Sequence, residues 1–294
     1  MSAGEPVNYT DKSLGTPTEW KWTFEGGTPA TSTEQNPTVV YEASGNYKVT
    51  LSVSNGTETS IKEKEDFVSV VSADYFKKNL VAYFPFDGSA EDAGPDNMAV
   101  ENHGNVTFDG TDRESNSNSS AVFDGGSALI IPDHSALNFD TDDFSVSVWI
   151  KTDQTDKMMI WQESGAEGSG DNQAWLRIGD NTTDRLLRFA TEDAGGGNII
   201  NYGDGLESGV SDNNWHHVVC VREGGITRLY IDGVKRGEMA RSGTKDVSNE
   251  QDFKIGAQEG PVGSYKTYFT GMLDDLRIYN KVLTDQEISD LYNL

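Results

Sequence analysis

The stretch DFSVSVWIKT at residues 143–152 alternates apolar and polar side chains. The even positions from Phe144 to Ile150 are all apolar, whereas the odd positions hold Ser145, Ser147 and Trp149. A period of two is typical of a β-strand with one buried face. Trp149 is therefore expected to project outward, and a large ring on the outer face of a sheet needs a cover or a ligand.

Comparable strand-like runs recur through the rest of the chain, between turns rich in Gly, Asn and Asp. They include AVFDG, ALIIPD, KMMIWQES, AWLRIGD, RLLRFATED, NWHHVVCVRE and FTGMLDDLRIYN. The tail LTDQEISDLYNL is the one good helix, because Thr284 and Glu287 form a T-x-x-E capping box. Residues 74–294 are predicted to be a jelly-roll β-sandwich with a short C-terminal helix docked on it.

Residues 1–73 form a separate, smaller unit of short alternating runs, such as YKVTLSV at 47–53. Short strands at regular intervals, separated by turns, indicate a small β-sandwich. The predicted fold class is therefore all-β, with two sandwiches in sequence.

Both units resemble known families. WTFEGG (22–27), NPTVVY (36–41) and GNYKVTLSVSN (45–55) resemble a PKD domain, an immunoglobulin-like sandwich, with Gly in place of the family's Asp in the first motif. LVAYFPFDGSAEDAGPDN, SAVFDGGSALIIPD, FSVSVWIKT, NNWHHVVCVREGGITRLYIDGV and FTGMLDDLRIYNKVLTDQEISDLY resemble, in order, the laminin-G-like, concanavalin-A-like domains of secreted bacterial carbohydrate-active proteins. The resemblance implies a PKD-like spacer before a lectin-type jelly roll.

Charge and hydropathy exclude some functions. The net charge of −25 repels phosphate backbones and argues against nucleic-acid binding. The chain has no apolar run of the roughly 18 residues that span a bilayer. Cys220 is the only cysteine, so no intrachain disulfide forms, and its strand setting indicates an inert buried thiol. We expect a bacterial cell-surface or extracellular location, with any signal segment or lipid anchor preceding these residues.

Carboxylates gather where the run LVAYF ends. Asp87 and Asp92 flank Gly88 in a turn that also exposes carbonyl groups, and Ca²⁺ prefers six to eight oxygen ligands. The resemblance implies a cation that joins the first and last strands, which adds Asp274 of MLDDLRIYN because Asp274 and Asp275 are expected to alternate faces. A structural calcium at Asp87, Asp92 and Asp274 is one interpretation; an acidic, solvated turn is the other.

Signals for catalysis are weak. The E-x-D-x-x-E strand of concanavalin-A-like glucanases is absent, and WQESGAEGSGD reads as a Gly-rich loop. His216 and Cys220 lie four residues apart on one expected strand, about 13 Å, too far for a nucleophile and its base. The sequence therefore predicts no catalytic residue and no enzyme.

Sugar binding requires aromatic rings for stacking and planar polar groups for the hydroxyls. Trp149 is expected to face outward, Trp175 and Arg177 share a face, and Arg188 lies in a neighbouring run. Trp161 precedes a loop that could rim a groove, and Tyr202 lies in a Gly-rich segment. These residues form the predicted carbohydrate-binding set, with cover by loops as the alternative.

The sequence leaves three functions open. The first is non-catalytic polysaccharide or oligosaccharide binding at a bacterial cell surface, with the PKD-like unit as spacer. The second is a protein-binding adhesion or matrix module. The third is a glycoside hydrolase or polysaccharide lyase with unrecognised acids. Exposed aromatic rings in a groove favour the first, a flat apolar patch the second, and paired carboxylates with raised pKa values the third.

Overall fold

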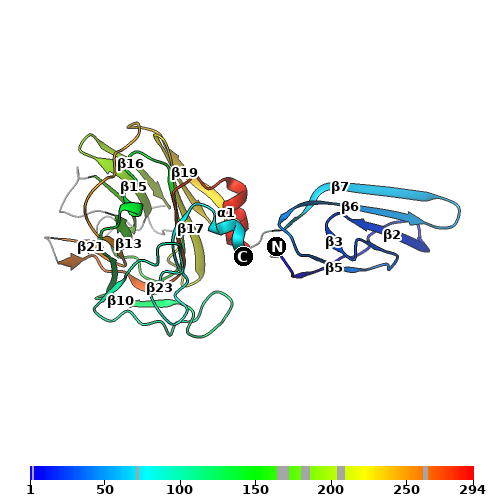
Figure 1. The fold of residues 1–294 in the computed structure, drawn as a ribbon, viewed down its shortest axis with the longest axis horizontal. Coiled ribbons are helices and arrows are strands. Elements are labelled where there is room, and N and C mark those ends of the chain that lie inside the picture. Colours follow the sequence, from blue (N-terminus) through cyan, green and yellow to red (C-terminus); the bar gives the residue numbers. More distant parts are fainter. Residues whose placement is uncertain (2, 71–72, 164–171, 180–185, 204–208, 261–263) are drawn as a thin grey trace. The chain divides into compact units, whose positions relative to one another are not determined.

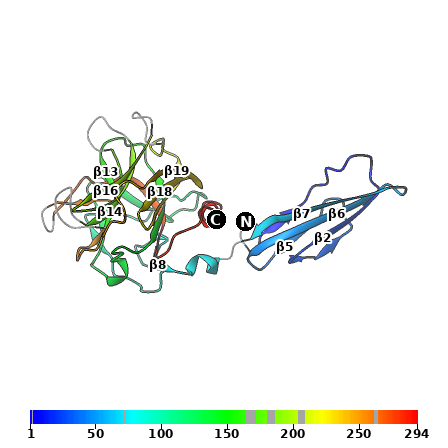
Figure 2. The same cartoon turned by 90° about the horizontal axis from the view of Figure 1, so that it is seen from above.

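The computed structural model describes the 294 residues except 2, 71–72, 164–171, 180–185, 204–208 and 261–263. The chain divides into two compact units (Figures 1 and 2). The first is Met1–Lys78 with Asn293–Leu294, and the second is Asn79–Tyr292. The all-β fold class predicted from the alternating runs is confirmed.

The first unit is a small sandwich of two antiparallel sheets. One sheet has the strand order β1 (Pro6–Asn8), β5 (Thr38–Tyr41), β3 (Gly27–Thr28). The other has the order β4 (Thr31–Ser32), β2 (Glu19–Phe24), β6 (Gly45–Ser54), β7 (Thr59–Val70). The buried cluster of Trp22, Phe24 and Tyr41 holds them together. A 3₁₀ helix, Ala73–Lys77, follows.

The second unit is a larger sandwich, and one of its two large sheets, here the β23 sheet, contains the last strand. Its order is β10 (Ala121–Asp124), β23 (Thr270–Tyr279), β12 (Phe144–Lys151), β17 (Trp215–Glu223), β18 (Ile226–Ile231), β19 (Val234–Met239). The first strand, β8 (Leu80–Phe84), also pairs with β23. The two ends of the domain are therefore neighbours through backbone hydrogen bonds.

The other large sheet, here the β14 sheet, also has seven strands. Its order is β16 (Gly196–Tyr202), β15 (Leu187–Asp193), β14 (Gln173–Ile178), β13 (Met158–Glu163), β20 (Phe253–Ile255), β11 (Ala128–Ile131), β9 (Glu101–His103). A two-stranded piece, β21 (Gln258–Glu259) and β22 (Tyr265–Lys266), and a 3₁₀ helix, Ser135–Leu137, complete the unit.

The core fills the space between these two sheets. Its largest members are no more than 1% exposed: Phe84, Phe123, Phe144, Trp161, Phe189 and Phe253. Burying each such ring contributes about 2 kcal/mol, which makes this the main stabilising layer. Alternate residues of each strand therefore face outward, and the candidate functional side chains lie on those two outer faces.

The helix α1 (Asp285–Tyr292) packs on the outer face of the β23 sheet, beside β17 and β19 (Figure 1). Thr284 N donates to Glu287 Oε2 at 2.9 Å, and Glu287 N donates to Thr284 Oγ1 at 3.2 Å. The predicted capping box is confirmed, and Ile288 and Leu291 are buried beneath the helix. In the part of the chain that the structure describes, no helix is long and apolar enough to cross a membrane.

Candidate functional site

The outer face of the β14 sheet carries polar side chains beside Trp175, which packs with the apolar Met159, Ala190 and Ile199. Ala174, Leu176 and Ile178 of β14 point into the core. Gln173, Trp175 and Arg177 therefore point outward, since side chains alternate along a strand. Neighbouring strands add further residues to this layer, which we call the β14 face: Gln162, Gln173, Trp175, Arg177, Arg188, Glu192 and Lys254, with Glu259 of the adjoining β21.

Hydrogen bonds connect the buried part of the β14 face. Glu192 Oε2 accepts from Gln173 Nε2 at 2.7 Å and from Trp175 Nε1 at 2.9 Å. Gln162 donates to Gln173 at 3.2 Å and accepts from the Glu259 amide at 3.1 Å. Each group has a fixed orientation, because buried amides and carboxylates with several partners cannot rotate freely.

The charged part of the β14 face lies on β14 and β15. Arg177 stacks on the Trp175 ring, with 4.2 Å from the guanidinium carbon to the ring centroid. Arg188 lies directly opposite Arg177 in the antiparallel register. Trp175 is 4% exposed, whereas both arginines and Glu192 are half-buried. A buried, hydrogen-bonded layer thus supports a more accessible rim of charged groups.

Three of the predicted sugar-binding residues, Trp175, Arg177 and Arg188, lie together on this face. Trp161 does not join them. The pairing of β13 with β14 has a bulge between Met159 and Trp161, which turns Ile160 and Trp161 both into the core. Trp161 stacks on Phe253 with ring centroids 5.7 Å apart and has no exposed surface, so the prediction that it is a carbohydrate-binding residue is wrong.

Tyr202 also lies apart from the β14 face. It pairs with Leu187, whose side chain is in the core, and its half-buried ring packs against that core. Arg236 lies 5.8 Å from the ring centroid. Residues 164–171 of the Gly-rich loop expected to rim a groove lie outside the described residues.

The two-residue periodicity of the strands could have identified further residues of the β14 face from the sequence. Gln173 lies two residues before Trp175, and Glu192 lies opposite Gln173 in the register. Lys254 stands between two core residues in a three-residue strand, which is an unusual place for a charge. Its ammonium lies 2.7 Å from Glu259 Oε2, so the pair is neutralised within the buried layer.

Trp149 lies on the other sheet. It faces outward from β12 as predicted, but it is covered and only 6% exposed. Tyr292 of α1 stacks on it, with ring centroids 5.7 Å apart, and the Arg113 guanidinium carbon lies 4.8 Å from its ring centroid. The cover anticipated for an outward tryptophan is thus supplied by the chain itself.

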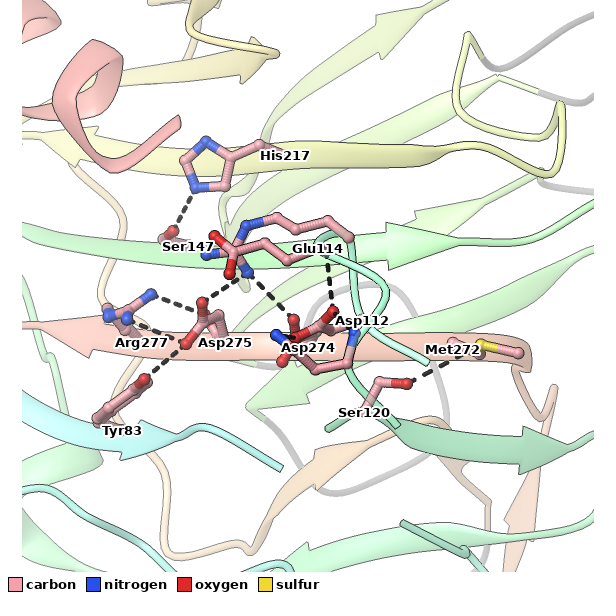
Figure 3. Close-up of polar contacts among 12 residues, drawn as sticks. Tyr83, Asp112, Glu114, Ser120, Ser147, His217, Met272, Asp274, Asp275 and Arg277 are labelled. Carbon is pink, nitrogen blue, oxygen red and sulfur yellow. Dashed lines mark hydrogen bonds and ion pairs between the residues drawn. The ribbon is translucent and has the colours of Figure 1, made fainter. Parts of the chain in front are cut away.

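A buried ion network includes Asp274, Asp275 and Arg277 (Figure 3), and its Arg113 also contacts Trp149. Arg113 Nη1 is 3.1 Å from Asp274 Oδ2 and 2.8 Å from Asp275 Oδ2. Arg277 lies 3.0 Å from Asp275, and the Tyr83 hydroxyl donates to Asp275 at 2.6 Å. The network joins the loop that carries Arg113 to β8 and β23, the first and last strands of the unit.

The sequence predicts that Asp274 and Asp275 alternate faces, and this prediction is wrong. The pairing of β12 with β23 shifts register between Ser147 and Trp149, and Asp275 has a φ of 49°. The resulting β-bulge brings both carboxylates to Arg113.

The two carboxyl groups titrate differently. Burial and the charge of Asp275 raise the pKa of Asp274 to about 8, despite the nearby Arg113. Burial also opposes ionisation of Asp275, but Arg277, Tyr83 and Arg113 together outweigh it and lower the pKa of Asp275. Burial lowers the pKa of the adjacent His217 to about 3, so its imidazole is neutral. Near neutral pH the network therefore contains two arginines, one full carboxylate and one mostly protonated carboxyl.

The three predicted calcium ligands do not converge. Asp92 is buried and accepts from the amides of Tyr83, Gly94 and Met98 at 2.7–2.9 Å. Asp274 is paired with Arg113, whereas Asp87 lies at the rim of the same cavity of about 670 Å³. Among the described residues, no group of three or more His, Cys, Asp or Glu could hold a metal ion. The residues present do not fit a divalent cation in this arrangement, and calcium stays a prediction.

The described carboxyl groups with raised pKa values do not form a catalytic pair. Burial raises the pKa of Glu163 to about 8, but its side chain faces inward from β13. Asp274, with a similar pKa, lies on the outer face of the β23 sheet. Burial also raises the pKa of the Cys220 thiol, which keeps it protonated. Neither arrangement provides an acid and base, or a nucleophile, around one reacting atom.

Two family models match the chain. The model of the concanavalin A-like lectin/glucanase superfamily matches residues 123–289, and the model of the PKD domain matches residues 2–70. The predicted order of the two families is confirmed. A curated relative, adhesion G-protein coupled receptor V1 of Danio rerio, is 27% identical over 157 residues, which are 51% of this chain and 2% of the receptor.

Solved structures share the fold of the second unit. The binding domain of Paraclostridial Mosquitocidal Protein 1 aligns with a TM-score of 0.56 and 20% identity, over 74% of this chain and 52% of that domain. Domain 4 of AbnA, an extracellular arabinanase from Geobacillus stearothermophilus solved with arabinotriose, aligns with a TM-score of 0.53 and 21% identity, over 73% and 98%. A botulinum neurotoxin DC binding domain solved with rat synaptotagmin II aligns with a TM-score of 0.54 and 16% identity, over 74% and 52%. The chain thus spans about half the length of two of these structures.

Proposed function

Because the chain belongs to the concanavalin A-like lectin/glucanase superfamily, we propose that its second unit is a non-catalytic carbohydrate-binding module. The proposed ligand site is the β14 face. The first unit, a PKD domain, serves as a spacer, and the protein works at a bacterial cell surface.

The observation behind this proposal is the layered construction of the β14 face. Gln162, Gln173 and Trp175 form a buried hydrogen-bonded layer with Glu192. Arg177 and Arg188 stand at its accessible rim. Sugar hydroxyls need donors and acceptors that are already oriented, because binding otherwise costs the ordering of each side chain. Groups held by a supporting layer meet that need.

Similar folds with ligands favour a carbohydrate. The arabinanase domain was solved with arabinotriose. Another neurotoxin DC binding-domain structure was solved with SialylT, at a TM-score of 0.53. These identities are low and indicate a fold suited to glycan binding, so the ligand of this chain is argued from its own residues.

The hydrogen bonds and ion pairs of the acidic side chains on the β14 face favour binding over hydrolysis. On the β14 face, Glu192 accepts two hydrogen bonds and Glu259 is ion-paired with Lys254. A hydrolase needs one carboxyl group to donate a proton and a second to act as base or nucleophile. Carboxylates held as acceptors and ion-pair partners serve better as fixed hydrogen-bonding groups.

Binding of the full chain to polysaccharides tests this function. We expect retention by at least one polymer in affinity electrophoresis, with no release of reducing ends. Trp175→Ala removes the ring beneath Arg177 and should weaken retention about thirtyfold, about 2 kcal/mol. Trp149→Ala is the matched control and should keep binding, because Trp149 lies on the other sheet.

The outcomes separate the three functions. If Trp149→Ala loses retention and Trp175→Ala keeps it, the carbohydrate site lies on the β23 sheet, and the proposal for the β14 face is wrong. Steady release of reducing ends would show an enzyme. Failure to retain any polymer would leave a protein partner as the next hypothesis, as the adhesion receptor relative suggests.

A further inference from the structure

The sandwich of the first unit has a groove between two of its edge strands. β7 is the edge strand of the four-stranded sheet (Figure 1), and β1 is an edge strand of the three-stranded sheet. Residues of both strands line a groove of about 900 Å³, with the apolar Val49, Leu51 and Val68 among them. Tyr9 and Trp22 of the core also line it. Part of the apolar core of this unit therefore borders an open groove.

A bulge in β7 places an aromatic ring at this groove. The pairing of β6 with β7 shifts register between Tyr47 and Val49, and Asp66 has a φ of 47°. Phe67 follows directly, lines the groove and is 47% exposed, with its ring centroid 6.5 Å from that of Tyr9. A half-exposed ring that continues the apolar lining is a surface that a ligand can cover.

The groove is positively charged in a strongly acidic protein. The chain has 48 Asp and Glu residues against 23 Lys and Arg residues. The described residues that line the groove include Lys12, Lys62 and Lys64 but no Asp or Glu. Lys64 Nζ lies 4.1 Å from the centroid of the Phe67 ring. The charge at the groove is thus opposite to that of the whole protein, which favours an anionic ligand.

The register of β7 explains why the lysines reach the groove. Lys62 lies opposite Leu51 of β6, and Leu51 packs on the core. Lys64 likewise lies opposite the buried Val49. Directly opposed side chains point to the same face of a sheet, so both lysines face inward, whereas Glu63 between them faces outward. The strand therefore presents its positive charges to the groove and its negative charge to the other face.

The outer edge of β7 can accept a further strand. Among the described residues, β7 pairs only with β6. Lysines at a sheet edge disfavour association with further copies of the same chain. Two copies paired antiparallel here would place Lys62 opposite Lys62 or Lys64, and like charges in facing positions destabilise a sheet. An extended chain with carboxylates at those positions would instead gain from the same contacts.

We propose that this groove binds an extended acidic peptide of another protein, which adds a strand to β7. Inward-facing Asp or Glu side chains of the peptide contact Lys62 and Lys64, and a large apolar side chain packs on Phe67. Backbone pairing supplies affinity in such strand addition, and alternate side chains supply specificity. The first unit thereby has a binding role besides that of a spacer, independent of the β14 face.

Synthetic peptides test this proposal on the full chain. Each has about ten residues, with Thr at alternate positions and two Glu and two Phe between them, so that Glu and Phe share one face of a strand. Both orders of Glu and Phe are used, because the added strand can be parallel or antiparallel. In fluorescence anisotropy, we expect one order to bind about tenfold tighter than the same peptide with Lys for Glu. Hydrogen exchange of β7 amides should slow on binding.

Two variants with the same change of charge locate the binding site. Lys62→Glu should weaken binding of the Glu peptide about fivefold and strengthen binding of the Lys peptide, because the cross-strand pair changes from attraction to repulsion and the reverse. Lys21 is exposed in β2 of the same sheet, and it faces outward because the adjacent Trp22 faces the core. Lys21→Glu is therefore the matched control and should leave both affinities unchanged.

Several results would overturn the proposal. Equal binding of the Glu and Lys peptides, binding of neither order, or no effect of Lys62→Glu would show that the groove does not select an acidic strand. Binding without slower exchange of β7 amides, together with competition by laurate, would assign the groove to an anionic amphiphile. A dimer seen by sedimentation velocity and lost in Phe67→Ala would assign it to a second copy of this chain. None of these results bears on carbohydrate binding by the β14 face.

Discussion

The outer faces of the two large sheets of the second unit each carry a tryptophan with an arginine against its ring, but the two pairs have different surroundings. On the β23 sheet, Arg113 lies 4.8 Å from the Trp149 ring and meets two carboxylates. On the β14 sheet, Arg177 lies 4.2 Å from the Trp175 ring and faces a second arginine. One arginine is part of a buried ion network, and the other lies half-buried at the rim of the β14 face.

The two tryptophan–arginine pairs differ in what lies over them. Trp149 is sealed by Tyr292 of α1, and its Arg113 lies within 3.1 Å of Asp274 and 2.8 Å of Asp275. Trp175 is fixed by its hydrogen bond to Glu192, and its Arg177 is half-buried at the rim of the β14 face. The cover over the tryptophan therefore separates the closed outer face of the β23 sheet from the β14 face, which is the proposed ligand site.

Removing Arg113 should give the largest effect. Arg113→Met removes one of the two arginines that face the buried Asp275 carboxylate, together with the hydrogen bond to Asp274, which should lower the free energy of unfolding of the second unit by about 3 kcal/mol. Hydrogen exchange of β12 and β23 in the full chain measures it without interference from the first unit. Arg241→Met is the surface control, with an expected change within about 0.5 kcal/mol. A loss below about 1 kcal/mol for Arg113→Met would break the comparison, because the network would then not hold this face closed.

The pH dependence of Asp274 should give a smaller effect. The raised pKa means that Asp274 is protonated in the folded state at pH values where the unfolded carboxyl is ionised. Unfolding then releases a proton, so stability falls as the pH rises from about 4 through about 8. Asp274→Asn cannot ionise and should lack this fall, so its stability relative to the wild type should grow across that range by at least about 1.4 kcal/mol, the value of one pKa unit.

Comparing the two proteins at each pH isolates this carboxyl. Glu163 and His216 also have raised pKa values, but they titrate in both proteins and cancel in the difference. A constant difference between pH 4 and 9 would contradict the assignment of the titration to Asp274. It would also mean that Arg113 holds both carboxylates ionised.

Chelation should give the smallest effect. With Asp92 engaged by three backbone amides and Asp274 by Arg113, EDTA is expected to leave the melting temperature of the full chain unchanged. Differential scanning calorimetry with and without EDTA, and with added Ca²⁺, measures it. A fall on chelation would restore the calcium clasp and require Arg113 to leave Asp274 in the metal-bound protein.

Much of the fold could be predicted because local patterns and burial agree. The alternation in residues 143–152 placed Trp149 outward, and the T-x-x-E motif placed the helix start, both as observed. The site was predicted only in part. Trp175, Arg177 and Arg188 were identified, but Trp161 was misplaced by the bulge after Met159, and the pair Asp274–Asp275 by the bulge in β23.

The sequence by itself determined two β-sandwiches, which face of each regular strand is apolar, and where the last helix begins. These follow from side-chain periodicity and capping, which act over a few residues. Only the tertiary structure decided that Arg113 closes over Trp149 and that Arg177 faces Arg188. Those outcomes depend on strand register and on single-residue bulges, because a shift of one residue exchanges the two faces of a strand and thereby changes which charges meet.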